Sequence, residues 1–170
     1  MSLLRVLVAY SSRNRSTAEI AAWIGETLRD RGLEADITAA EKAHDLTRYD
    51  AVVLGSAVYV GRWRHDAKRF AALHRRQLLR MPVWLFSSGR RSTSGRDEPI
   101  PPPRRVARIA RRLGAEEHRT FGGRLTDGAR GVLAGRILGE GPGGDLRDQQ
   151  EVSAWGGDIA ARLRSERARV

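Results

Sequence analysis

The 170-residue chain contains no cysteine, which excludes a disulfide scaffold, a thiolate metal site and a cysteine nucleophile. It also lacks an apolar run near the ~20 residues that span a bilayer, and its first residues do not have the form of a secretion signal. We therefore expect a cytoplasmic protein. The length suits one domain with a proper core better than two, so a single domain over residues 1–170 is expected.

Lysine is scarce as well, since 29 of the 31 basic residues are arginine. The net charge of +11 comes from the middle third of the chain. Residues 61–112 carry 15 basic and 3 acidic residues, whereas the segments on either side are close to neutral. Two interpretations stay open: a solvated arginine-rich surface, or a basic patch that meets an anionic ligand, a lipid surface or nucleic acid. No sequence-specific nucleic-acid partner is predicted.

Apolar strands alternate with amphipathic helices along the chain. We predict strands within 3–10, 34–38, 49–59, 81–88 and 118–123, and helices from about 18 to 30, 65–79, 104–114 and 148–168, the last weakened by two glycines. This order predicts an α/β fold in which helices cover both faces of a parallel sheet. Ligands bind at the carboxyl ends of such strands, so the segments 11–17, 56–63 and 87–103 are the candidate site.

The first of these segments, SSRNRST, joins a strand to a helix N-terminus, where unpaired N–H groups favour an anion. Several of its side chains suit a phosphate: Ser11, Ser12, Asn14, Ser16 and Thr17. A plainer interpretation is that Ser16 or Thr17 only caps the helix, with Glu19 completing a capping box. The spacing matches neither of the glycine-rich nucleotide-binding motifs.

Other chemistries hosted by α/β folds lack their residues in this sequence. A phosphoacceptor receiver domain needs acidic residues after its first strand and a lysine after its fifth, but Ser11 and Ser12 follow the first strand and Lys68 is the last lysine. The four histidines have no metal-ligand spacing, so no metal site is predicted and each histidine is interpreted as a surface or helix residue. The serine-hydrolase elbow is absent too.

Taken together, the stretches SSRNRST (11–17), GSAVYVGRW (55–63) and FSSG (86–89) resemble the three flavin-contacting loops of flavodoxin-like proteins. They are most similar to the branch that contains menaquinone-dependent protoporphyrinogen oxidase and related bacterial flavodoxin-domain proteins. The resemblance implies a flavodoxin-like three-layer sandwich with a five-stranded parallel sheet that binds FMN noncovalently. It implies that the phosphate loop consists of Ser11, Ser12, Arg13, Asn14, Arg15, Ser16 and Thr17, and that the flavin ring lies between Ala57, Val58, Tyr59 and Gly61 on one side and Ser88 and Gly89 on the other.

The chain departs from this family at three places. Arg15 stands where the family commonly has glycine; it either adds a phosphate contact or crowds the loop, and both interpretations stay open. The glycine-rich insert 124–147 after the fifth strand is shorter than in the oxidase branch and has no aromatic residue. The third loop is lengthened with arginine at 90, 91 and 96.

The resemblance implies an FMN-dependent oxidoreductase that transfers electrons between an organic donor and a quinone or similar acceptor. A tetrapyrrole-like molecule is one candidate for the donor. The flavin would carry the chemistry, with no catalytic side chain required. Residues 61–112 would make peripheral contact with an anionic membrane surface, at the inner face of the membrane. Two alternatives stay open: a flavodoxin-fold binding or regulatory module that has lost flavin, and a flavodoxin-type electron carrier. The oligomeric state is open as well, a dimer through apolar residues of 132–138 being one option.

Overall fold

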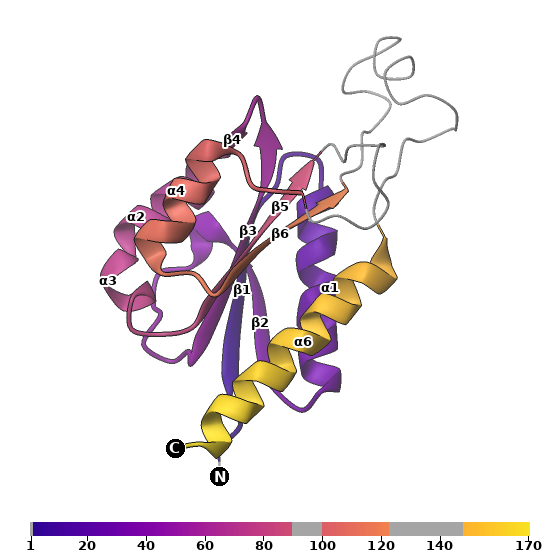
Figure 1. Cartoon of the computed structure of the whole chain (residues 1–170), viewed down its shortest axis with the longest axis vertical. Coiled ribbons are helices and arrows are strands. Elements are labelled where there is room, and N and C mark those ends of the chain that lie inside the picture. Colours follow the sequence, from indigo (N-terminus) through magenta and orange to yellow (C-terminus); the bar gives the residue numbers. More distant parts are fainter. Residues whose placement is uncertain (1, 90–99, 123–147) are drawn as a thin grey trace.

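The computed structural model describes residues 2–89, 100–122 and 148–170, which form a sheet with helices on both faces (Figure 1). The strands are β1 (Arg5–Ser11), β2 (Glu34–Ala39), β3 (Ala51–Tyr59), β4 (Arg62–Trp63), β5 (Val83–Gly89) and β6 (Glu117–Gly122). The helices are α1 (Ser16–Asp30), α2 (His65–Leu73), α3 (Arg75–Leu78), α4 (Arg104–Leu113) and α6 (Gln149–Ala168), with a 3-10 turn η1 (Ala40–Lys42) after β2. The predicted alternation of strands and helices is confirmed.

The sheet has the strand order β2-β1-β3-β5-β6, and every neighbouring pair in this order is parallel. The chain starts in β1, forms β2 on one side and then crosses to β3 on the other, so the order reverses between β1 and β3. A ligand crevice forms at the carboxyl ends of strands beside such a reversal. The two-residue strand β4, which pairs antiparallel with β3, was not predicted.

The core is divided by the sheet into two layers. Alternate residues of β1 illustrate the division: Val6 and Val8 belong to the cluster under α1 and α6, whereas Leu7 and Ala9 belong to the cluster under α2 and α4. Figure 1 shows α1 and α6 together on one side of the sheet and α2, α3 and α4 on the other. Strands buried on both faces need apolar residues at every position, which explains the unbroken apolar runs in the sequence.

Residues 65–79 do not form the single helix that their spacing predicts. The backbone of His74 (φ −103°, ψ 15°) ends α2, and α3 begins at the next residue. The amide of Leu78 donates to the carbonyl of His74 at 2.9 Å, so the residue that ends α2 also caps the start of α3. Across the described ranges, no helix is long and apolar enough to cross a bilayer.

The glycine pair in α6 serves packing, although in isolation each glycine lowers helix propensity. A Cβ atom at Gly156 would lie 3.2 Å from the side chain of Thr27 in α1, and one at Gly157 would lie 3.2 Å from the guanidinium of Arg31. The helix continues through both positions to Ala168. The two glycines therefore let α6 lie close against α1, and the expectation that they weaken the helix misses this gain.

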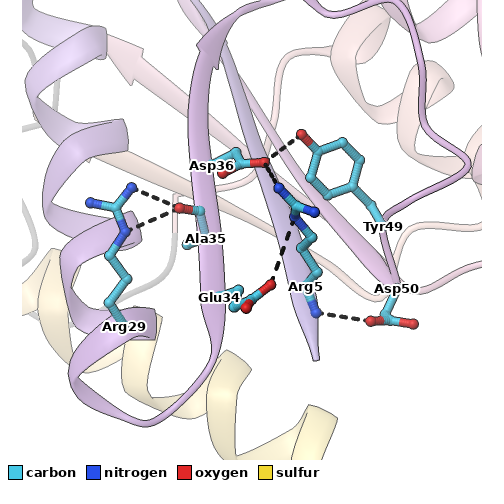
Figure 2. A network of polar contacts seen from close by, with 7 residues as sticks. All are labelled: Arg5, Arg29, Glu34, Ala35, Asp36, Tyr49 and Asp50. Carbon is cyan, nitrogen blue, oxygen red and sulfur yellow. Dashed lines mark hydrogen bonds and ion pairs between the residues drawn. The ribbon is translucent and has the colours of Figure 1, made fainter. Parts of the chain in front are cut away.

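A polar network closes the amino-terminal ends of β1 and β2 (Figure 2). The guanidinium of Arg5 lies 3.2 Å from Asp36 and 3.8 Å from Glu34, and the Tyr49 hydroxyl donates to the same Asp36 carboxylate at 2.7 Å. Burial, followed by this hydrogen bond, raises the pKa of Tyr49 to about 12, so the phenol keeps its proton. The network gives the polar Arg5 a structural role at the edge opposite the candidate site.

Candidate functional site

The three predicted segments meet at the carboxyl edge of the sheet, because β1, β3 and β5 are parallel neighbours that end at Ser11, Tyr59 and Gly89. The register pairs Ser11 with Ser56 and Ala57 with Ser88, so the strand ends stand level with one another. The remainder of the third segment, residues 90–99 with their three arginines, lies outside the described residues, as does the insert 124–147.

The first loop has the backbone of a glycine loop although it contains no glycine. Arg15 has φ 62° and ψ −12°, a left-handed conformation, and occupies the N-cap position of α1 with no side-chain cap hydrogen bond. Ser16 and Thr17 lie inside the first turn of the helix, one and two residues after the N-cap position that the capping interpretation gives to one of them. The Arg15 side chain is exposed at this position. The loop thus keeps, at Arg15, a backbone conformation that glycine favours.

The loop also presents polar groups that the protein itself does not satisfy. The Ser12 hydroxyl is buried and has no hydrogen-bond partner in the part of the chain that is described. It lies beside the N-terminus of α1, where peptide N–H groups and the helix dipole favour an anion. Because a buried polar group without a partner is costly, an orphan hydroxyl at this place fits a phosphate ligand. The Arg13 and Arg15 side chains are exposed at the same loop, and Asn14 is half-buried there.

Three hydrogen bonds join the three loops pairwise. The Thr17 and Ser88 hydroxyls lie 2.7 Å apart and link the first loop to the third. Arg64 donates from Nε to the Ser11 hydroxyl at 3.1 Å and links the segment after β4 to the first loop. The Trp63 indole N–H donates to the Ser87 hydroxyl at 2.8 Å and links the second loop to the third. These hydrogen bonds hold the three loops together in one arrangement.

A row of buried serines underlies this arrangement. Ser11, Ser56 and Ser87 pair across β1, β3 and β5 at one register and are at most 2% exposed. The Ser56 hydroxyl accepts from the Arg64 amide at 2.9 Å and donates to the Ala57 carbonyl at 2.8 Å. Because Ser11 and Thr17 direct their hydroxyls to protein partners, Ser12 is the serine of the loop with an uncommitted buried hydroxyl. Nothing in the sequence alone distinguishes these hydroxyls from one another.

His118 belongs to the same polar layer, and the sequence pattern did not predict this position for it. It lies half-buried in β6, and its Nε2 is 2.7 Å from the Ser87 hydroxyl. Burial lowers the pKa of His118 to about 4, against an opposing effect of the neighbouring Glu117 charge, so the imidazole is neutral at pH 7. Its Nδ1 is buried without a partner among the described residues. The register that brings His118 to Ser87 cannot be read from spacing, so the interpretation as a surface or helix residue is wrong.

The second loop is a tight hairpin between β3 and β4. Val60 (φ 50°) and Gly61 (φ 70°) form its tip, and Val60 is 98% exposed. A left-handed β-branched residue is uncommon, and such strain concentrates at functional sites. Tyr59 is 39% exposed beside it, while Trp63 is buried. Of the remaining predicted residues, Ala57 and Val58 are half-buried, and a Cβ at Gly89 would lie 3.6 Å from Val58 Cβ, so the second and third loops approach closely.

The family model for the flavodoxin domain matches residues 7–127 of this chain, a stretch that includes all three loops. The chain belongs to the flavodoxin-domain family. Protoporphyrinogen IX dehydrogenase (quinone) from Escherichia coli K12 is similar to it, with 27% identity over 86 residues that cover 49% of this chain and 48% of that protein. The same protein from strain CFT073 matches equally. The match thus spans about half the length of these curated relatives.

Solved structures share the flavodoxin fold at low sequence identity. A flavodoxin from the domain Archaea has a TM-score of 0.61 and 16% identity, covering 95% of this chain and 99% of that chain. Rubredoxin oxygen:oxidoreductase from Desulfovibrio gigas has a TM-score of 0.65 and 15% identity, covering 96% of this chain and 37% of that chain. A mutant of flavodoxin from Pseudomonas aeruginosa gives a TM-score of 0.63 and 16% identity, covering 95% of this chain and 99% of that chain. The flavodoxin-like sandwich with five parallel strands is therefore confirmed.

Proposed function

We propose that this chain binds FMN at the carboxyl edge of its sheet and transfers electrons between an organic donor and a quinone-type acceptor. The first loop carries the proposal: its backbone turns at the left-handed Arg15, and the buried Ser12 hydroxyl lacks a partner among the described residues at the N-terminus of α1. These features fit the phosphate of FMN. The exposed Arg13 and Arg15 add positive charge at the loop mouth, which favours the dianionic phosphate further.

When bound, the flavin supplies the redox chemistry, so the side chains have binding and orienting roles. In this proposal Ser12, Asn14, Ser16 and the loop amides hold the phosphate. The ring lies between the hairpin residues 57–61 and the end of β5 at Ser88 and Gly89. The exposed Tyr59 offers an aromatic face to one side of the ring. The Trp63–Ser87 hydrogen bond joins these two walls, and the Thr17–Ser88 bond joins one of them to the phosphate loop. A fixed geometry of this kind would reduce the ordering cost of binding.

The donor and acceptor classes rest on the partial similarity to the E. coli quinone-dependent dehydrogenase. Over one turnover the organic donor loses two electrons and two protons, and the quinone takes up both to become a quinol. The matched stretch spans about half of that relative. Protoporphyrinogen is therefore one candidate donor to be tested. Residues 90–99 and 124–147, which would bear on substrate choice, lie outside the described residues.

Titration of the purified protein with FMN, followed by flavin fluorescence, tests the cofactor. We expect stoichiometric quenching with the unaltered chain and with Arg15→Gly. Ser12→Ala should weaken affinity at least about tenfold, because it removes a buried hydrogen-bonding group from the phosphate. Ser165→Ala, an exposed serine in α6, is the matched control and should bind as the unaltered chain does.

The outcomes separate the proposal from its alternatives. Failure of both the unaltered chain and Arg15→Gly to bind FMN would contradict the proposal and favour a flavin-free binding module. FMN-loaded protein should then reduce a soluble quinone when given a reduced tetrapyrrole donor. If it exchanges electrons only with a reductase protein, an electron carrier is the better description.

A further inference from the structure

The two helical layers have opposite charge balances. Along α1 and α6 there are 4 basic and 6 acidic residues, whereas residues 65–80 and 104–113, which contain α2, α3 and α4, hold 10 basic residues and one acidic residue, Asp66. All ten basic side chains are exposed: Lys68, Arg69, Arg75, Arg76, Arg80, Arg104, Arg105, Arg108, Arg111 and Arg112. Within the described ranges none of the ten has an ion pair with a carboxylate. We call this surface the basic face.

Two exposed leucines lie within the basic face. The exposed positions of residues 65–80 recur every three or four residues, which places them along one outward stripe despite the break at His74. Leu73 is 68% exposed and Leu79 is 52% exposed on this stripe, with Arg76 between them in the chain. On the described helices and their caps these are the exposed large apolar side chains. Leu73 and Leu79 thus add an apolar component to a surface that is otherwise strongly basic.

Helix α4 extends the surface beside α2 and α3. Arg75 donates from Nε to the carbonyl of Arg112 at 3.5 Å, which joins the two parts of the basic face. Arg104, Arg108 and Arg111 lie at helical spacing along α4 and line, with Ala107, a hollow of about 420 Å³. Three arginines beside one hollow favour an anionic group such as a phosphate. The net charge of α4 is +5 over ten residues, with no acidic residue.

We propose that the basic face docks on an anionic lipid bilayer. The arginines would contact lipid phosphates, and Leu73 and Leu79 would enter the boundary between headgroups and acyl chains, where their burial is favourable. A nucleic acid would satisfy the arginines but would leave the leucines in water. The opposite layer of α1 and α6, with its excess of acidic residues, would face away from the membrane. Docking of this kind does not depend on FMN and extends the proposed function by placing the protein where quinones dissolve.

Vesicle co-sedimentation with the full chain tests the proposal. We expect binding to phosphatidylcholine vesicles that contain about 30% phosphatidylglycerol, little binding to pure phosphatidylcholine, and release between roughly 0.05 and 0.5 M salt as charges are screened. A basic residue near an anionic surface contributes about fivefold to affinity, so the triple variant R76Q/R108Q/R111Q should bind roughly 100-fold more weakly. The matched control R164Q/R167Q/R169Q removes three charges from the α6 side and should change affinity less than about fivefold.

The leucines distinguish a membrane from a polyanion. L73S/L79S keeps every charge and should reduce vesicle affinity by about fivefold or more, while binding to a short duplex DNA stays unchanged. Thermal unfolding confirms that each variant is folded, which is expected because all the altered side chains are at the surface. Three outcomes would overturn the proposal: no preference for the anionic vesicles, an equal loss in the α6 control, or a leucine variant that binds vesicles as tightly as the unaltered chain.

Discussion

The hydroxyl of Thr17 lies 2.7 Å from the hydroxyl of Ser88, although the two residues are 71 positions apart in the chain. Thr17 is in the first turn of α1 and Ser88 is near the end of β5, and both side chains are buried. This one hydrogen bond ties the proposed phosphate loop to the proposed wall of the flavin ring. The arrangement of the site therefore depends on a contact that no local pattern in the sequence contains.

The losses of stability from removing the two partners of this bond should not be additive. Thr17→Val leaves the Ser88 hydroxyl buried without a partner and should lower the free energy of unfolding by about 1–3 kcal/mol. In Thr17→Val/Ser88→Ala the loss should be smaller than the sum of the single losses. Urea denaturation measures each value. Thr47→Val, whose hydroxyl bonds to Asp45 at the surface, is the control and should stay within about 0.5 kcal/mol; strictly additive losses would show that the bond contributes nothing.

Glycine should stabilise the two positions where a side-chain-bearing residue adopts a left-handed conformation. Arg15→Gly and Val60→Gly should each raise the free energy of unfolding by about 1 kcal/mol, because the left-handed strain removed exceeds the added entropy of the unfolded chain. Denaturation of each variant measures the change. Arg13→Gly, at a neighbouring position without positive φ, should be neutral or destabilising; the same gain there would contradict the explanation from backbone strain.

His118 should make stability depend on pH between about 6.5 and 4. Its pKa is lowered to about 4 in the folded protein, so over this range the unfolded chain binds more protons than the folded one. The stabilising contribution is complete above the unfolded pKa and is lost as pH falls through the folded pKa, by about 2 kcal/mol after allowance for solvent. Comparison with His118→Gln by denaturation at several pH values isolates the effect from the carboxylates. Parallel profiles for the two proteins would exclude it.

Gly55 in the middle of β3 should not tolerate a methyl group. A Cβ atom there would overlap the ring of Phe86 in the neighbouring strand, and both residues are in the closely packed centre of the sheet. Gly55→Ala should therefore destabilise the protein by about 1–3 kcal/mol. Adding Phe86→Leu should recover part of this loss by making room, whereas Phe86→Leu alone should only destabilise. Urea denaturation measures each variant, and a Gly55→Ala protein as stable as the original would mean that the ring moves freely.

Much of the fold follows from local patterns in the sequence. The apolar runs around Val6, Val53 and Leu85 specify buried strands, and the four-residue spacing of Ile20, Ile24 and Leu28 specifies the buried face of α1. These patterns are local because strand and helix periods depend on neighbouring residues. Their alternation, read with the family resemblance, was sufficient to predict the parallel sheet and the edge at which the three loops meet.

The break at His74 and the role of the glycine pair in α6 were not predictable in this way. Helical spacing continues through residues 65–80, so nothing in the pattern marks the interruption. Gly156 and Gly157 look like helix breakers until Thr27 and Arg31 are placed against them. In both places the deciding neighbour belongs to the folded backbone or to another helix.

The sequence by itself determined the kind of site: hydroxyls, an amide and arginines at a strand-to-helix turn beside two other strand ends. Only the tertiary structure decided which of these groups have partners. Within the described residues Ser11 is committed to Arg64, Thr17 to Ser88, and Ser87 to Trp63 and His118, whereas Ser12 is left without one. The physical reason is strand register, because a shift of one residue along β5 would exchange the faces of Ser87 and Ser88 and break their contacts with Trp63, His118 and Thr17.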